Sequence, residues 1–122
     1  MFKFMMVFYQ PDDLTKFENS YNDLLALVER MPSIKRRQVI NVVGSPQGKS
    51  PYYRILEVYF DDQATMQAAM LSPAGQEAGG QLMQFGAGSF ELIFAEVFEE
   101  IGGSTPLTNP STTGETDDNA RT

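Results

Sequence analysis

The stretch YRILEVYFDD, from Tyr53 to Asp62, holds the residues best suited to chemistry. Its alternation is typical of a β-strand, on which successive side chains point to opposite faces. Glu57 stands in mid-strand among apolar neighbours, where burying a lone carboxylate is costly. It therefore forms an ion pair with Arg54, Lys3 or a partner chain, lies at a solvated edge, or acts as an acid or base in a pocket. Arg54 lies on the opposite face, so a pair within the strand is disfavoured.

Aromatic hydroxyls and rings complete the candidate site. Tyr9, Tyr21 and Tyr59 are candidates to line one cavity and to donate hydrogen bonds, although each also suits a core position with its hydroxyl at the surface. Arg54 is a candidate to hold an anionic group. The candidate catalytic residues are Glu57 and Tyr59, and the candidate ligand-binding residues are Tyr9, Tyr21, Arg54 and Phe85.

Composition excludes several kinds of site. The chain has 122 residues with no cysteine and no histidine, so thiol nucleophiles, disulfides, zinc–thiolate sites and histidine bases are all excluded. We expect no metal and no cofactor. The net charge of −7 argues against a nucleic-acid partner, which requires a basic surface. No apolar run approaches the roughly 18 residues of a membrane span, and we expect a soluble cytoplasmic protein with no membrane partner.

The hydrophobic pattern predicts the elements that must position these residues. Strands are expected over residues 2–9, 38–43, 52–60 and 90–98. Helices are expected over residues 14–28, 64–71 and 73–85, with the acid pairs at residues 12–13 and 61–62 as helix starts and Ser72 as a cap before Pro73. The order β-α-β-β-α-β predicts an α+β, ferredoxin-like fold with a four-stranded antiparallel sheet.

Two features extend beyond the single domain. Helices cover only one face of such a sheet, yet three of the predicted strands are apolar on both faces. We therefore expect a homodimer through the sheet faces, a dimeric α/β barrel.

Residues 1–100 form the predicted domain. Residues 101–122 are rich in Gly, Ser, Thr, Asn and Pro, which predicts a flexible polar tail.

Four segments resemble the EthD family over about residues 1–99. They are YRILEVYFDD at residues 53–62, MQAAMLSPAGQ at residues 66–76, Phe85 with Gly86 and Gly88, and ERMPSI at residues 29–34. The resemblance implies a ferredoxin-like monomer, a sheet-to-sheet homodimer and a small cavity between sheet and helices. It also implies relatives that are isomerases, lyases, decarboxylases or cofactor-free oxygenases, and namesake members that accompany the degradation of ethyl tert-butyl ether. Many members carry a first-helix histidine; here Leu24 stands nearest that place.

Two functions follow as hypotheses. In the first, the protein is a noncatalytic dimer that binds or shields a small hydrophobic or aromatic metabolite in a catabolic pathway, or serves as an accessory subunit. The methionine-rich interior and the missing histidine favour this hypothesis. In the second, it is a cofactor-free isomerase, lyase or oxygenase-like enzyme that uses Glu57 as acid or base and the tyrosines as hydrogen-bond donors. A Glu57 carboxylate inside a cavity beside a tyrosine would favour the enzyme.

Overall fold

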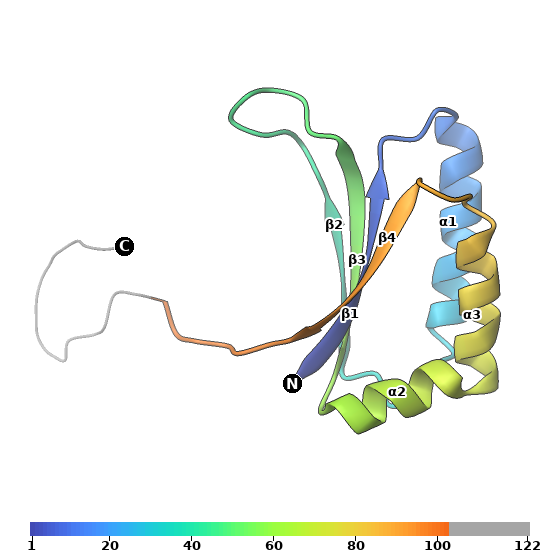
Figure 1. Ribbon diagram of the computed structural model, residues 1–122, viewed down its shortest axis with the longest axis vertical. Helices are drawn as coiled ribbons and strands as arrows, with labels where there is room; N and C mark the ends of the chain where they lie inside the picture. Colours follow the sequence, from blue (N-terminus) through green and yellow to red (C-terminus); the bar gives the residue numbers. More distant parts are fainter. Residues whose placement is uncertain (103–122) are drawn as a thin grey trace, which may run out of the picture.

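A single antiparallel sheet forms the centre of the molecule (Figure 1). The computed structural model describes residues 1–102. The strands are β1 (Phe2–Tyr9), β2 (Arg36–Asn41), β3 (Tyr52–Phe60) and β4 (Phe90–Glu96). Their spatial order is β2-β3-β1-β4, so β1 and β3 are central and β2 and β4 are the edges. With the helices, this order gives the predicted ferredoxin-like arrangement.

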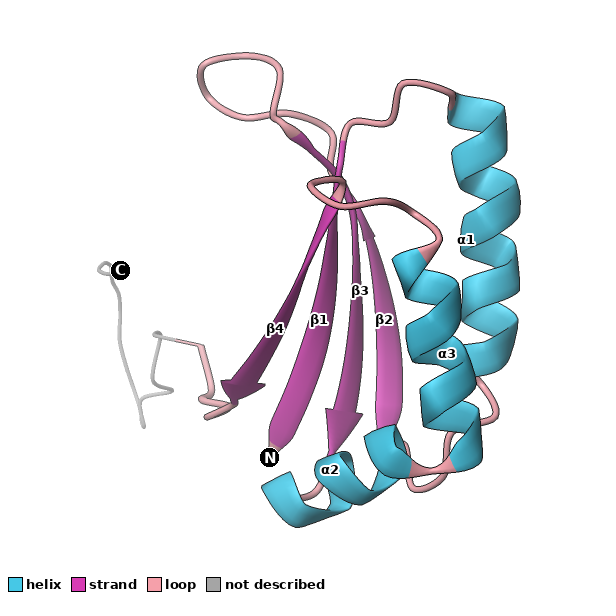
Figure 2. Ribbon diagram, turned by 45° about the vertical axis from the view of Figure 1, so that its right-hand side comes forward, coloured by secondary structure: helices cyan, strands magenta, loops and turns pink. Residues whose placement is uncertain are grey.

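The helices lie on one side of the sheet (Figure 2). They are α1 (Leu14–Val28), α2 (Gln63–Leu71) and α3 (Pro73–Met83); α1 and α3 lie side by side, and α2 lies at one end of the sheet. Each begins at the predicted cap. The side chains of Asp13, Asp62 and Ser72 accept hydrogen bonds from backbone N–H groups three residues later, which satisfies donors that the first turn leaves unpaired.

The core fills the layer between the helices and the sheet. It is built from alternate residues of the two central strands: Phe4, Met6, Phe8, Leu56, Val58 and Phe60. The apolar stripe of α1 packs on these residues through Phe17, Tyr21, Leu24 and Val28. Leu24, Val28, Phe8 and Phe60 are completely buried. The side chains of opposite parity on the strands therefore lie on the face away from the helices, which we call the open face.

Four predicted elements have other bounds in the structure; α2 begins at Gln63, one residue before its predicted start. β2 covers residues 36–41 rather than 38–43, and it begins early because Arg36 already pairs with Tyr59 on β3. β4 ends at Glu96 rather than at residue 98, because Glu96 lies opposite Phe2, the first residue of β1. The last helix ends at Met83 rather than at residue 85, where Gln84 caps it and a glycine turn follows.

Two further expectations concern the whole chain. Residues 103–122 of the predicted polar tail lie outside the described residues. Within residues 1–102, none of the helices has the length and apolar content needed to cross a membrane.

Candidate functional site

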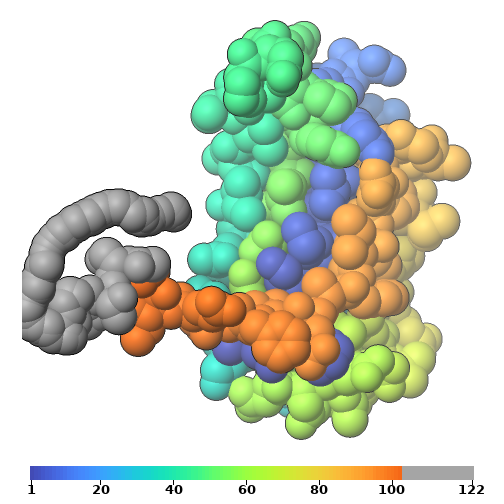
Figure 3. Space-filling model, turned by 60° about the vertical axis from the view of Figure 1, so that its left-hand side comes forward, coloured from blue at the N-terminus to red at the C-terminus, as the bar shows by residue number. Residues whose placement is uncertain are grey.

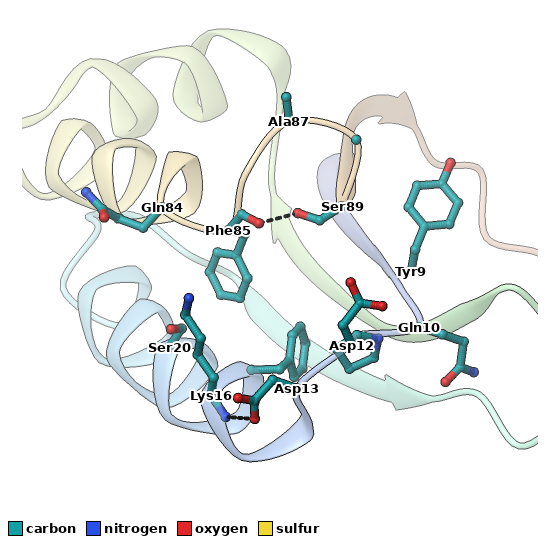
Figure 4. A pocket seen from close by; sticks show the side chains of 13 residues that line it. Tyr9, Gln10, Asp12, Asp13, Lys16, Ser20, Gln84, Phe85, Ala87 and Ser89 are labelled. Carbon is teal, nitrogen blue, oxygen red and sulfur yellow. Dashed lines mark hydrogen bonds between the residues drawn. The ribbon is translucent and has the colours of Figure 1, made fainter.

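A cavity of about 440 Å³ opens where β1 leads into α1 and where α3 returns to β4 (Figure 4). The apolar part of its lining comes from Pro11, Phe17, Phe85 and Ala87. The polar part includes Gln10, Asp12, Lys16, Ser20, Gln84 and Ser89. A volume of this size suits a small organic molecule, and the lining offers polar and apolar surface in about equal parts.

Two short segments shape the cavity. Pro11 ends β1, and Asp13 then caps α1, which brings Lys16 and Phe17 to one wall. On the other side, Gly86 and Gly88 adopt φ of 90° and 82°, a conformation that favours glycine.

The second of these turns is held by a side chain. The Ser89 hydroxyl oxygen lies 2.6 Å from the Phe85 carbonyl oxygen and 2.7 Å from the Gly86 carbonyl oxygen, and its single O–H donates to this pair. These bonds fix the loop that carries Phe85 above Phe17.

Aromatic rings form the inner wall. The ring of Phe85 lies 5.6 Å from that of Phe17 and 5.0 Å from that of Phe8, measured between centroids. Phe8 and Phe17 are 5.4 Å apart and meet edge to face. These distances and angles are those of favourable aromatic pairs. Phe17 and Phe85 thus support each other at the cavity, and Phe8, which is completely buried, packs against both from the core.

Arg54 and Tyr21 lie deeper, between α1 and the sheet. The Arg54 guanidinium donates to both carboxylate oxygens of Glu18, at 2.6 and 3.0 Å, and to Asn41 Oδ1 at 2.9 Å. It also lies 4.6 Å from the centroid of the Tyr21 ring. The hydrogen bonds from Arg54 and from Tyr53 lower the pKa of Glu18. Arg54 is thus bound to a carboxylate of its own chain.

The Tyr21 hydroxyl is the one buried side-chain polar atom without a hydrogen-bond partner among residues 1–102. Burial raises the pKa of this tyrosine, so its hydroxyl stays protonated and available as a donor. The Tyr21 ring stacks on Phe17, a residue of the cavity wall, at 5.9 Å. A buried unsatisfied hydroxyl is unfavourable, and Tyr21 is not one of the residues that line the cavity.

Glu57 and Tyr59 lie on the open face, with the sheet between them and the helices. The Tyr59 hydroxyl donates to Glu57 Oε1 at 2.7 Å, and Lys3 Nζ lies 3.4 Å from the same oxygen. Glu57 is only 7% exposed. Burial, followed by the hydrogen bond to Glu57, raises the pKa of Tyr59. The predicted ion pair of Glu57 is therefore formed with Lys3, not with Arg54.

The structure does not bring the six predicted residues into one cavity. Tyr9 and Phe85 line the cavity, and Tyr21 and Arg54 lie behind Phe17. Tyr59 lies on the opposite face of the sheet, so the expectation that Tyr9, Tyr21 and Tyr59 share one cavity is wrong within the chain. The Tyr9 ring stacks on Tyr52, and its hydroxyl donates to the Glu91 carboxylate.

Sequence reasoning missed several lining residues. Lys16 and Ser20 read as the solvent side of an amphipathic helix, and Asp12 as part of a helix start. Each description is correct locally. What places them around a cavity is the glycine turn after α3, which lies more than sixty residues later in the chain. The Phe-Gly-x-Gly segment was the available signal, because it marks a tight turn beside an aromatic ring.

Comparison with known proteins identifies similar chains. The EthD domain matches residues 14–85. An uncharacterized 11.0 kDa protein from the thcB–thcC intergenic region of Rhodococcus erythropolis is 29% identical over 98 residues, covering 79% of this chain and 94% of that protein.

Solved structures are similar too. An EthD family protein from Bacillus halodurans is 31% identical with a TM-score of 0.77, covering 80% of this chain and 99% of that one. A dimeric ferredoxin-like protein of unknown function from Jannaschia is 20% identical with a TM-score of 0.59, covering 80% and 100%. At that identity the second likeness concerns the fold alone.

Proposed function

The chain belongs to the EthD family, and from that premise we propose that it binds a small hydrophobic or aromatic metabolite in the cavity between α1 and the turn that joins α3 to β4. The observation that carries this proposal is the cavity of about 440 Å³ with Phe17 and Phe85 in its wall. Pockets of this volume hold small organic ligands, and aromatic walls favour flat apolar ones.

The polar groups of the cavity orient the ligand. Lys16 and Asp12 place a cation and a carboxylate on the same lining, and Ser20 and Gln84 add neutral hydrogen-bonding groups. A ligand with an apolar ring and one polar substituent satisfies both parts of this lining.

The proposed assembly is a homodimer formed through the open faces. The open face carries exposed Ile40 and Ile93 at its edges and the buried Glu57–Tyr59 pair at its centre. A second sheet covers such a face efficiently, since two sheets pack through facing side chains at about 10 Å. Relatives described as dimeric, such as the Jannaschia protein, support this assembly.

The enzyme hypothesis has less support from the geometry. Glu57 would be its acid or base, yet Glu57 lies on the open face rather than in the cavity. Leu24, nearest to the place of the family's helix histidine, is completely buried in the core and offers no proton-transfer group. Binding without chemistry is therefore the function that the arrangement favours.

Titration of the ¹⁵N-labelled protein with 2-naphthol, followed by NMR, tests the proposal. Amide shifts are expected to concentrate at Phe17, Phe85 and Ser89, around the cavity. Replacing Ser20→Phe places a ring in the cavity and is expected to abolish these shifts. The matched control is Asn19→Phe, which adds the same ring one position earlier on α1, at an exposed residue outside the lining.

Each outcome is informative. Shifts that vanish in S20F and persist in N19F support binding in the cavity. Shifts that concentrate at Ile40, Ile55 and Ile93 instead would place the apolar binding surface on the open face and would contradict the proposal. Equal binding by both variants would contradict it as well.

A further inference from the structure

The segment that follows β4 leaves the body of the molecule on the side of the open face. Figures 1 and 3 show residues 97–102 projecting from the foot of the sheet, away from the helices. The last ladder contact is the hydrogen bond from Val97 N to the Met1 carbonyl. Beyond it, Phe98 is 77% exposed and Ile101 is 92% exposed. Two large apolar side chains are therefore accessible to another chain on this projecting segment.

The same segment is acidic. Glu99 and Glu100 lie between the two apolar residues, and both are exposed. We call residues 97–101 the acidic segment. None of its carboxylates forms an ion pair with another described residue. Its chemistry therefore fits a partner surface that combines an apolar strip with an unpaired cation.

The edge strand β2 carries such a surface. All six of its residues are exposed, and Ile40 lies on the open face. Arg36 lies on the open face too, with its guanidinium 4.2 Å from the centroid of the Tyr59 ring. Lys35 and Arg37 already pair with Asp61 and Glu29, but no carboxylate of residues 1–102 pairs with Arg36. Stacking on Tyr59 thus holds an unpaired cation at the edge of the open face.

Sheet geometry brings the two surfaces together in a dimer. Phe2 pairs with Glu96 at the end of β4, and Arg36 pairs with Tyr59 beside it, so both features lie at the same end of the sheet. A two-fold axis parallel to the strands, between two facing sheets, carries β4 of one copy over β2 of the other and keeps the strand ends together. Each exposed edge strand then lies beside an edge strand of the other copy.

We propose that the acidic segment of each copy binds the β2 edge of the other, with Glu99 and Glu100 pairing with Arg36 and with Phe98 and Ile101 covering Ile40. This inference rests on the homodimer proposed above and specifies which surfaces hold it. The two-fold symmetry gives each dimer two copies of this contact. In each contact, charged groups form the rim and apolar side chains form the centre, as in many specific interfaces.

Charge reversal in separate chains tests the inference. The variants E99R/E100R and R36E are each expected to raise the dimer dissociation constant by on the order of tenfold or more, because every contact then joins like charges. Mixing the two variants is expected to restore a heterodimer of wild-type affinity, since both contacts again join opposite charges. Glu77→Arg, on an exposed helix residue, is the control and is expected to leave the constant unchanged.

Native mass spectrometry of the full chains distinguishes the outcomes. A heterodimer that dominates the mixture supports the inference. Variants that dimerise like the wild type, or a mixture without preference for the heterodimer, overturn the inference while leaving the sheet-to-sheet dimer in place. A monomeric wild-type protein overturns both the inference and the proposed homodimer.

Discussion

The hydroxyl of Tyr59 donates a 2.7 Å hydrogen bond to Glu57, two residues earlier on the same strand and on the same face of the sheet. Lys3 from β1 completes the cluster at 3.4 Å from the same carboxylate oxygen. This arrangement explains how a carboxylate stands in the middle of a largely apolar strand. It is partnered on the open face, and the sheet separates it from the cavity that we propose as the ligand site.

Replacing Glu57→Ala is expected to lower the free energy of unfolding by about 1–3 kcal/mol, because it leaves Lys3 without its carboxylate and leaves the Tyr59 hydroxyl only the longer bond to Gln38 Oε1, at 3.1 Å. Glu57→Gln keeps one acceptor oxygen and is expected to cost less. Urea denaturation at one fixed protein concentration measures both, since dimerisation links stability to concentration. Equal losses in the two variants would contradict this role for the carboxylate.

Replacing Arg54→Lys is expected to destabilise the fold by about 1–2 kcal/mol, because lysine cannot form the two-pronged bond to Glu18 while also reaching Asn41. The partial exposure of Glu18 keeps the loss below that of a fully buried pair. Arg30→Lys is the matched control, since Arg30 pairs with Glu77 at an exposed site. Similar losses at both positions would show that the Arg54 network adds little.

Glu18 predicts an acid dependence of stability. Its pKa in the folded protein lies below the usual 4.5, because Arg54 and then Tyr53 bind its charged form. The resulting stabilisation is complete above the unfolded-state pKa and is lost as the pH falls through the lowered folded-state value. Between about pH 5.5 and about pH 3, the wild type should therefore lose more stability than Glu18→Gln. Parallel losses in both proteins, measured by urea denaturation, would refute this.

Two glycines of α3 give opposite predictions for the same substitution. A Cβ on Gly75 would overlap the backbone carbonyls of Ala69 and Met70, where α2 meets α3. Gly75→Ala is therefore expected to destabilise by about 1–3 kcal/mol. A Cβ on Gly79 meets nothing within 4 Å, so Gly79→Ala should stabilise by about 0.5–1 kcal/mol through helix propensity. Thermal unfolding of both variants measures these changes in stability. A change of the same sign in both variants would contradict the close approach of Gly75 to the end of α2.

Much of the fold follows from local patterns. β1 and β3 have the predicted boundaries, because Pro11 and the acid pair at residues 61–62 end clear alternations of side chains. α1 also has the predicted boundaries, because its apolar stripe follows the cap at Asp13. The start of β2 and the end of β4 are different, since they depend on pairing with Tyr59 on β3 and with Phe2 on β1. A strand ends where it has no neighbouring strand to pair with, even if its residues have high β-propensity.

Less of the candidate site follows from the sequence. Strand parity placed Arg54 and Glu57 on opposite faces, but it does not tell which face the helices cover. That choice decides that Arg54 meets Glu18 on α1 and that Glu57 meets Lys3 on the open face. The cavity depends in addition on contacts between α1 and a turn far along the chain, which no local pattern encodes.

Native mass spectrometry of the protein purified from its source cells tests the central claim most directly. We predict a dimer that carries the extra mass of a small apolar molecule, lost on denaturation, and a dimer without this mass for Ser20→Phe purified in the same way. The control Asn19→Phe is expected to keep the ligand. An extra mass that S20F retains, or a wild-type dimer that carries none and takes up no 2-naphthol, would contradict a ligand site in the cavity.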